Sequence, residues 1–132
     1  MTVAALLLAA MLAWEDPPKD VIEFFRSVAA ALGDAHEDGN AGAFLDHFDK
    51  SMPGYVEFAD RIESMTGAGD VSTSIDFVNI DGDDRKRTIE LDWLLQCEGE
   101  RARRALITCT VEKRGKSWKI TAIAPIAFFR RE

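Results

Sequence analysis

The chain has 132 residues and a formal net charge of −7 at pH 7, and 47% of its residues are hydrophobic. This length fits one domain, and the hydrophobic content suffices for a core that needs no disulfide or metal to hold it together. The acidity argues against nucleic acid as a partner, because phosphate binding requires clustered Lys and Arg.

The N-terminal residues are typical of a secretory signal. Val3 to Ala13 is an uncharged run rich in Ala and Leu. It is too short to span a bilayer but long enough for the hydrophobic part of a signal peptide. We therefore expect residues 1–13 to be a signal peptide, residues 14–132 to form a single domain, and the protein to be exported (periplasmic or secreted). No Lys or Arg precedes the run, and Met11 is not the small residue that cleavage favours. A mature N-terminal helix in a cytoplasmic protein is therefore the alternative.

Residues 17–70 predict three helices. Pro17-Pro18 opens the first, whose apolar residues recur at helical spacing and form one stripe: Val21, Phe25, Val28, Ala29 and Leu32. We expect this helix to end from Gly33 onward. A second helix begins near Asn40, which can cap it, and its apolar face is Ala41, Phe44, Leu45 and Phe48. A third starts at Tyr55, and the Gly-Ala-Gly-Asp stretch at 67–70 closes the helical half.

From residue 71 onward, apolar and polar side chains alternate as they do in strands. Turn sequences at 81–84, 98–101 and 114–116 separate four strands, and consecutive hairpins give an antiparallel sheet with one face for the helices to cover. The predicted inward-facing residues are Ile75, Phe77, Leu91, Trp93, Leu95, Ile107, Cys109, Val111, Trp118 and Ile120, with Ala122 and Ala124 continuing this face. The acidic strand residues fall on the opposite face: Asp76, Glu90, Asp92 and Glu112.

The two cysteines are predicted to be buried thiols and not a disulfide. With the second hairpin turn centred near Gly99, Cys109 lies opposite about Leu91, and Cys97 is then about six residues, or ~20 Å, out of register with it. A disulfide needs Cα atoms within ~7 Å. The two histidines match no standard ligand spacing, so no metal or other cofactor is expected.

Three segments carry a resemblance to a known family: the stripe Val21–Leu32, the segment Phe44-Leu45-Asp46-His47-Phe48, and the last hairpin from Val111 to Ile120. In this order they resemble the nuclear transport factor 2-like superfamily, whose fold is shared with ketosteroid isomerase-like and polyketide cyclase-like proteins, over residues 19–129. The resemblance implies an α+β fold with N-terminal helices packed on a curved antiparallel sheet, a cystatin-like cone with a pocket at its open end. The family often has a short strand between its second and third helices, for which only 51–54 is available here.

The resemblance also implies that the pocket holds a small apolar ligand, as in many members. Combined with the strand alternation, it gives six candidate lining residues: Tyr55, Phe77, Trp93, Ile107, Cys109 and Trp118. Thr73 and Asn79 share the phase of Ile75 and are expected near the pocket mouth. None of the inward-facing strand residues is charged, and no residue-by-residue match to the catalytic set of the isomerase-like members exists, so no catalytic residue is expected.

Three functions are compatible with these observations. The preferred one is non-catalytic binding of a small apolar molecule in the cone. The second is a homodimeric assembly module that pairs through apolar residues on the outer face of the sheet and an aromatic tail, namely Val78, Leu94, Leu106 and Phe128-Phe129. The third is an acid–base enzyme of the isomerase or cyclase type that uses Tyr55 and His47 or a helix carboxylate.

Overall fold

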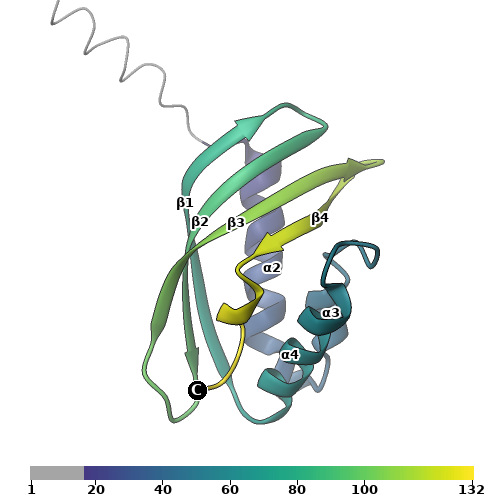
Figure 1. Cartoon of the computed structure of the whole chain (residues 1–132). Coiled ribbons are helices and arrows are strands. Elements are labelled where there is room, and N and C mark those ends of the chain that lie inside the picture. The colour runs from purple at the N-terminus through teal and green to yellow at the C-terminus, as the bar shows by residue number, and fades with distance from the viewer. Residues whose placement is uncertain (1–16) are drawn as a thin grey trace, which may run out of the picture.

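The apolar stripe of the first predicted helix forms the buried face of a long helix. In the computed structural model, which describes residues 17–132 (Figure 1), α2 spans Lys19–Asp38 and buries Val21, Phe25, Val28, Leu32 and Ala35. The helix runs through Gly33, where an end was predicted, because a single internal glycine costs only ~1 kcal/mol in a well-packed helix. Gly39 ends it instead, in the left-handed conformation with φ of 59°. The predicted signal peptide at 1–13 lies outside the described residues.

Two shorter helices follow. α3 spans Ala41–Leu45, and the side-chain oxygen of Asn40 accepts a hydrogen bond from the Ala43 N–H at 3.2 Å, which confirms the predicted cap. α4 spans Tyr55–Gly67, as the sequence indicated. Within residues 17–132, no helix combines the length and apolar composition needed to cross a membrane.

The segment after α3 leaves the helix to pair with the sheet. The Ile120 N–H donates to the His47 carbonyl at 2.9 Å, and the Asp49 N–H donates to the Ile120 carbonyl at 2.8 Å. Phe48 thereby forms an isolated parallel bridge with Ile120. The predicted second helix is therefore shorter at its end than its apolar spacing suggested. The short strand that the family often has after its second helix is represented here by the single bridge at Phe48, before the segment 51–54.

The four strands form the predicted antiparallel meander. β1 (Val71–Gly82), β2 (Lys86–Cys97), β3 (Arg103–Arg114) and β4 (Ser117–Ala124) lie in the order β1-β2-β3-β4. Cys109 pairs with Ile89, two residues from the position expected. A shift of two residues leaves each side chain on its predicted face. Both cysteines are free and buried, as predicted.

Two bulges change which residues face inward near the strand ends. In β1 the register skips Val78, so that Ile80 is half-buried and Asn79 is exposed. In β4 the register skips Thr121, so that Ile123 is buried. The predictions that Asn79, Ala122 and Ala124 face inward were therefore wrong, because one extra residue in a strand reverses the faces of the residues beyond it.

The C-terminal segment completes the core. After β4 the chain makes a short turn, η1 (Ile126–Phe128), and places Phe129 at 0% exposure with its ring edge-on to Trp93 at 5.1 Å and to Phe58 at 5.3 Å. Arg103 holds this segment by donating to the Phe128 carbonyl at 3.0 Å. Phe128-Phe129 was predicted to be an exposed aromatic tail that takes part in pairing. The tail is buried instead, because the chain crosses from the end of β4 to the part of β3 that β4 does not cover.

We expect Phe129→Ala to lower the free energy of unfolding by about 3–5 kcal/mol, since it removes a fully buried aromatic ring. The control Val56→Ala truncates a side chain that is 73% exposed and should change stability by less than about 0.5 kcal/mol. Urea denaturation followed by circular dichroism measures both. A loss below about 1 kcal/mol for Phe129→Ala would contradict the packing described for the tail.

Candidate functional site

Most of the six predicted lining residues are packed against protein. Trp93, Ile107 and Cys109 are each 0% exposed, and Trp118 is 4% exposed. A side chain with no accessible surface adjoins no space large enough for water, so the interior around the first three is filled. The filling is aromatic, with Phe129 against Trp93 and further rings from the helical side: Phe44, Phe48 and Phe58.

The polar atoms near this interior have partners. The Trp93 indole N–H donates to the Thr73 hydroxyl at 2.7 Å, and that hydroxyl donates to the Leu94 carbonyl at 3.0 Å. The Thr73 hydroxyl is therefore the hydrogen-bond acceptor of the buried indole. This differs from the prediction, which placed Thr73 near the pocket mouth. Asn79 points to the outside and donates to Asp81 at 3.1 Å.

The candidate nucleophiles and bases of residues 17–132 lie at separate places in the structure and do not form one catalytic group. Burial raises the pKa of the Cys109 and Cys97 thiols, which makes both poor nucleophiles. The Nδ1 of His47 lies 3.2 Å from the Phe44 carbonyl, and its ring packs on Phe24. Tyr55 is half-buried at the start of α4. Across residues 17–132 no group of His, Cys, Asp and Glu side chains is arranged to hold a metal ion.

An apolar groove opens between α2 and the edge strand β1, and we call it the α2–β1 groove. Its volume is about 260 Å³, and its lining is Ile22, Phe25, Arg26, Ala29, Ile75 and Phe77. Phe25 and Phe77 meet edge-on at 5.7 Å across it. Ile75 and Phe77 belong to the inward face of the sheet but stay half-buried. The helix thus leaves part of the apolar edge strand uncovered.

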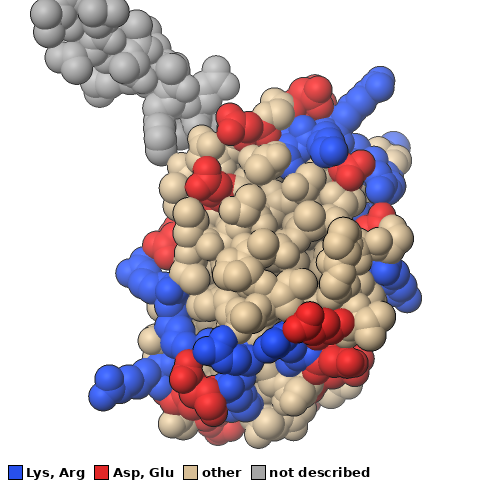
Figure 2. Space-filling view, in the orientation of Figure 1, with Lys and Arg blue, Asp and Glu red and all other residues tan. Residues whose placement is uncertain are grey.

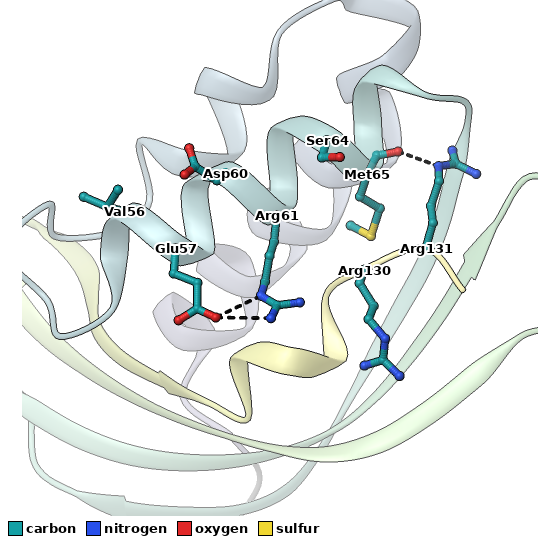
Figure 3. Close-up of a pocket in the computed structure, with 8 residues that line it drawn as sticks. All are labelled: Val56, Glu57, Asp60, Arg61, Ser64, Met65, Arg130 and Arg131. Carbon is teal, nitrogen blue, oxygen red and sulfur yellow. Dashed lines mark hydrogen bonds and ion pairs between the residues drawn. The ribbon is translucent and has the colours of Figure 1, made fainter.

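A second, larger groove separates α4 from the C-terminal segment (Figure 3). It measures about 720 Å³, and most of the residues that line it are of polar or charged types: Val56, Glu57, Asp60, Arg61, Ser64, Met65, Arg130 and Arg131. Some of its charged groups pair with one another or with the backbone, whereas the Nη2 atom of Arg131 is buried without a hydrogen-bond partner in residues 17–132. Arg61 pairs with Glu57 at 3.1 Å, and Arg131 Nε donates to the Met65 carbonyl at 2.9 Å. This groove is the surface junction where the tail meets the helix.

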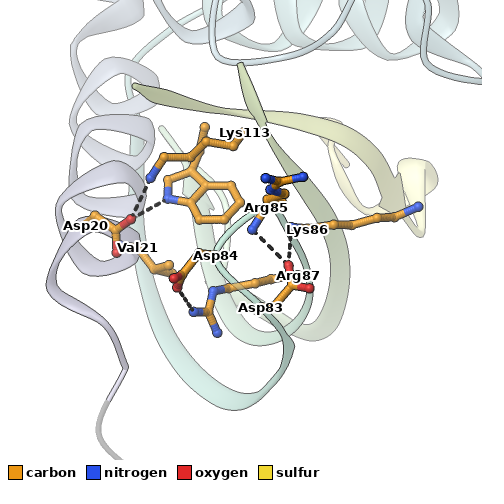
Figure 4. Close-up of polar contacts among 9 residues, drawn as sticks. Asp20, Val21, Asp83, Asp84, Arg85, Lys86, Arg87 and Lys113 are labelled. Atoms are coloured by element: carbon orange, nitrogen blue, oxygen red, sulfur yellow. Dashed lines mark hydrogen bonds and ion pairs between the residues drawn. The ribbon is translucent and has the colours of Figure 1, made fainter. Parts of the chain in front are cut away.

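The opposite end of the cone holds a polar cluster around the start of α2 (Figure 4). The Asp20 carboxylate accepts hydrogen bonds from Lys113 Nζ and Trp118 Nε1, each at 2.9 Å. The Lys113 ammonium also lies 4.5 Å from the centre of the Trp118 ring. The hydrogen bond from Lys113 is the main reason that the pKa of Asp20 lies below its ordinary value. Trp118 was predicted to line the pocket, but its indole instead contacts Asp20 and Lys113 in this cluster.

The two aspartates of the β1–β2 turn, Asp83 and Asp84, make local contacts within the hairpin. One oxygen of Asp83 accepts hydrogen bonds from the Arg85 N–H at 2.9 Å and the Lys86 N–H at 3.1 Å, which lower the pKa of Asp83. Arg87 pairs with Asp84 at 3.4 Å (Figure 4). A hairpin turn is present here as predicted, but Asp81 and Gly82 still pair with β2 as the end of β1, and the turn itself is formed by residues 83–85.

Comparison with known proteins identifies the fold. The sequence matches no known protein family and no curated protein. A nuclear transport factor 2-like protein of unknown function from Shewanella oneidensis has a TM-score of 0.58 at 14% identity, over 79% of this chain and 93% of that one. The chain has the nuclear transport factor 2-like fold. Other matching structures are described as cystatin-like, so the predicted α+β cone is confirmed.

Two further solved structures match the fold of this chain. Bd1075 from Bdellovibrio bacteriovorus has a TM-score of 0.67 at 13% identity over 80% of this chain, which spans only 38% of that protein's length. A protein from Xanthomonas campestris, described as a calcium/calmodulin-dependent protein kinase II association domain, has a TM-score of 0.62 at 17% identity over 83% of this chain and 86% of that one. At these identities the likeness concerns the fold alone.

The sequence placed Phe25 and Ala29 on the apolar stripe of α2 but did not indicate that Arg26 lines a groove beside them. Phe77 was predicted as a lining residue, and the groove contains it. Ile22, Arg26 and Ala29 recur at helical spacing of four and three residues, which places them on one helix face. Ala29 already belonged to the predicted apolar stripe, so the position of Arg26 three residues before it was the available signal.

We expect Asp20→Asn to reduce stability by about 1 kcal/mol at pH 7, because the charge-assisted contacts to Lys113 and Trp118 are weakened and partly screened by solvent. The folded-state pKa of Asp20 is lowered. Its contribution is therefore present above the ordinary pKa of 3.8 and is lost as the pH falls through the lowered folded value.

Urea denaturation at pH 7 and near pH 3 measures the difference between wild type and variant. The matched control is Asp60→Asn, an exposed residue without a hydrogen bond to the rest of residues 17–132, which should stay within about 0.5 kcal/mol at both pH values. A stability difference for Asp20→Asn that is the same at both pH values would refute the assignment.

Proposed function

We propose that this domain binds a small apolar molecule without catalysis, and that the molecule occupies the α2–β1 groove. The observation that carries the proposal is the partial exposure of Phe77 and Ile75, two inward-facing sheet residues, beside an apolar helix face. Filling the groove would remove this surface from water, at roughly 25 cal/mol for each Å² buried.

The size of the groove limits the ligand. At about 260 Å³ it is slightly smaller than the ~300–1,000 Å³ of most small-molecule sites. The aromatic packing around Trp93 and Phe129 leaves no accessible surface on either residue, so a larger ligand requires these rings to move. Phe77 is the direct contact in this proposal. Trp93, Ile107 and Cys109 would contact only a ligand that reaches into the core. The two remaining predicted lining residues, Tyr55 and Trp118, do not line this groove.

Homodimeric assembly through the outer sheet face is the second candidate. Leu106 is 53% exposed and Val78 is 41% exposed on that face. Figure 2 shows one face of the molecule, on which charged side chains surround a broad uncharged area. Asp92 and Arg104 form an ion pair at 2.6 Å next to Leu106 in the ladder, which interrupts the apolar surface. We therefore rank assembly second, and a monomeric mass at micromolar concentration would remove it.

An acid–base enzyme ranks third. Such an enzyme needs a titratable group aimed into an enclosed apolar space. Asp76 and Asp92 lie on the outer face, and the side chains of His47 and Tyr55 lie at the helix edges, away from the α2–β1 groove.

The test uses octanol, a neutral apolar probe, and thermal unfolding. We expect octanol to raise the melting temperature of the wild-type protein, because a ligand that binds only the folded state stabilises it. Ala29→Leu fills the α2–β1 groove and should weaken octanol binding about tenfold or more, the effect of roughly 1.4 kcal/mol.

The matched control is Ala30→Leu, an equal change at the next residue, which is exposed. It should bind octanol like the wild type. The proposal is wrong if octanol fails to stabilise the wild type, or if both variants bind it equally well.

A further inference from the structure

Arg26 is the one charged residue that lines the α2–β1 groove. Its side chain is exposed and forms no ion pair or hydrogen bond with another residue of 17–132. Most other arginines of the fold are engaged, and those that pair with a carboxylate include Arg61, Arg87, Arg103, Arg104 and Arg114. The guanidinium at the groove therefore has its hydrogen-bond donors available to a ligand.

Arg26 is one of few basic residues in the acidic half of the sequence. Residues 1–66 contain 12 acidic and 4 basic side chains, a net charge of −8. The net charge of this half gives no general attraction for anions, so an anion that binds at the groove needs a local contact. A guanidinium offers two parallel N–H donors that match one carboxylate. Its aliphatic stem can lie along an apolar chain that enters the groove.

We infer that the natural ligand is an amphipathic monoanion, with an apolar chain in the α2–β1 groove and a carboxylate on Arg26. This inference rests on the proposed function and adds the chemical class of the ligand. A single cation suits a single negative charge, since no second basic side chain of residues 17–132 lines the groove. A fatty acid-like carboxylate has both parts, whereas a neutral alcohol or hydrocarbon uses the groove and leaves Arg26 in water.

The experiment compares octanoate with octanol, which have the same chain length and differ in the head group. Isothermal titration calorimetry at neutral pH should show octanoate binding the wild-type protein about threefold to tenfold more tightly, the gain expected from one exposed charge-assisted pair. Arg26→Gln should remove this gain and leave octanol affinity unchanged. The matched control Arg101→Gln changes an exposed arginine in the β2–β3 turn and should alter neither affinity.

The outcomes separate the inference from the function on which it rests. Equal binding of octanol and octanoate by the wild type overturns the role of Arg26 and leaves the apolar groove intact as a site. The inference also fails if Arg26→Gln weakens both probes alike, since the arginine would then support the groove and not the head group. No binding of either probe overturns the proposed function itself.

Discussion

The structure depends on covering the inner face of one curved sheet. β2 and β3 present rows of fully buried side chains, among them Trp93 and Ile107, which need apolar partners along the whole face. α2 covers one part, and Phe129, arriving from the C-terminus, covers another. The edge strand β1 is covered least completely, and the α2–β1 groove lies along it. The same requirement thus explains both the filled interior and the open edge.

Strand alternation was enough to predict which way the central side chains face. Trp93, Ile107 and Cys109 are all buried as expected, because a side-chain period of two is fixed by backbone geometry. The bulges at Val78 and Thr121 could not be predicted, since neither residue differs from its neighbours in a way that demands an extra position. Beyond each bulge the faces reverse, which is why the expectations for the strand ends were wrong while those for the strand centres were correct.

The candidate site was predictable in part. Alternation indicated that Phe77 faces the helices, but it carries no information on whether space remains beside it. That depends on how α2 crosses β1 and on whether Phe129 fills the rest of the cone, both of which are contacts between distant parts of the chain. The helical spacing of Ile22, Arg26 and Ala29 was visible in the sequence. It did not indicate a groove, because the other wall of the groove is formed by Ile75 and Phe77 of β1.

The central claim is that ligands meet this domain at the α2–β1 groove and not inside the aromatic core. Backbone amide chemical shifts, followed by NMR during titration with octanol, test it most directly. The account predicts shift changes concentrated at Ile22, Ala29, Ile75 and Phe77, which line the groove. Changes centred on Trp93, Cys109 and Phe129 would show that the ligand enters the core, and would contradict it.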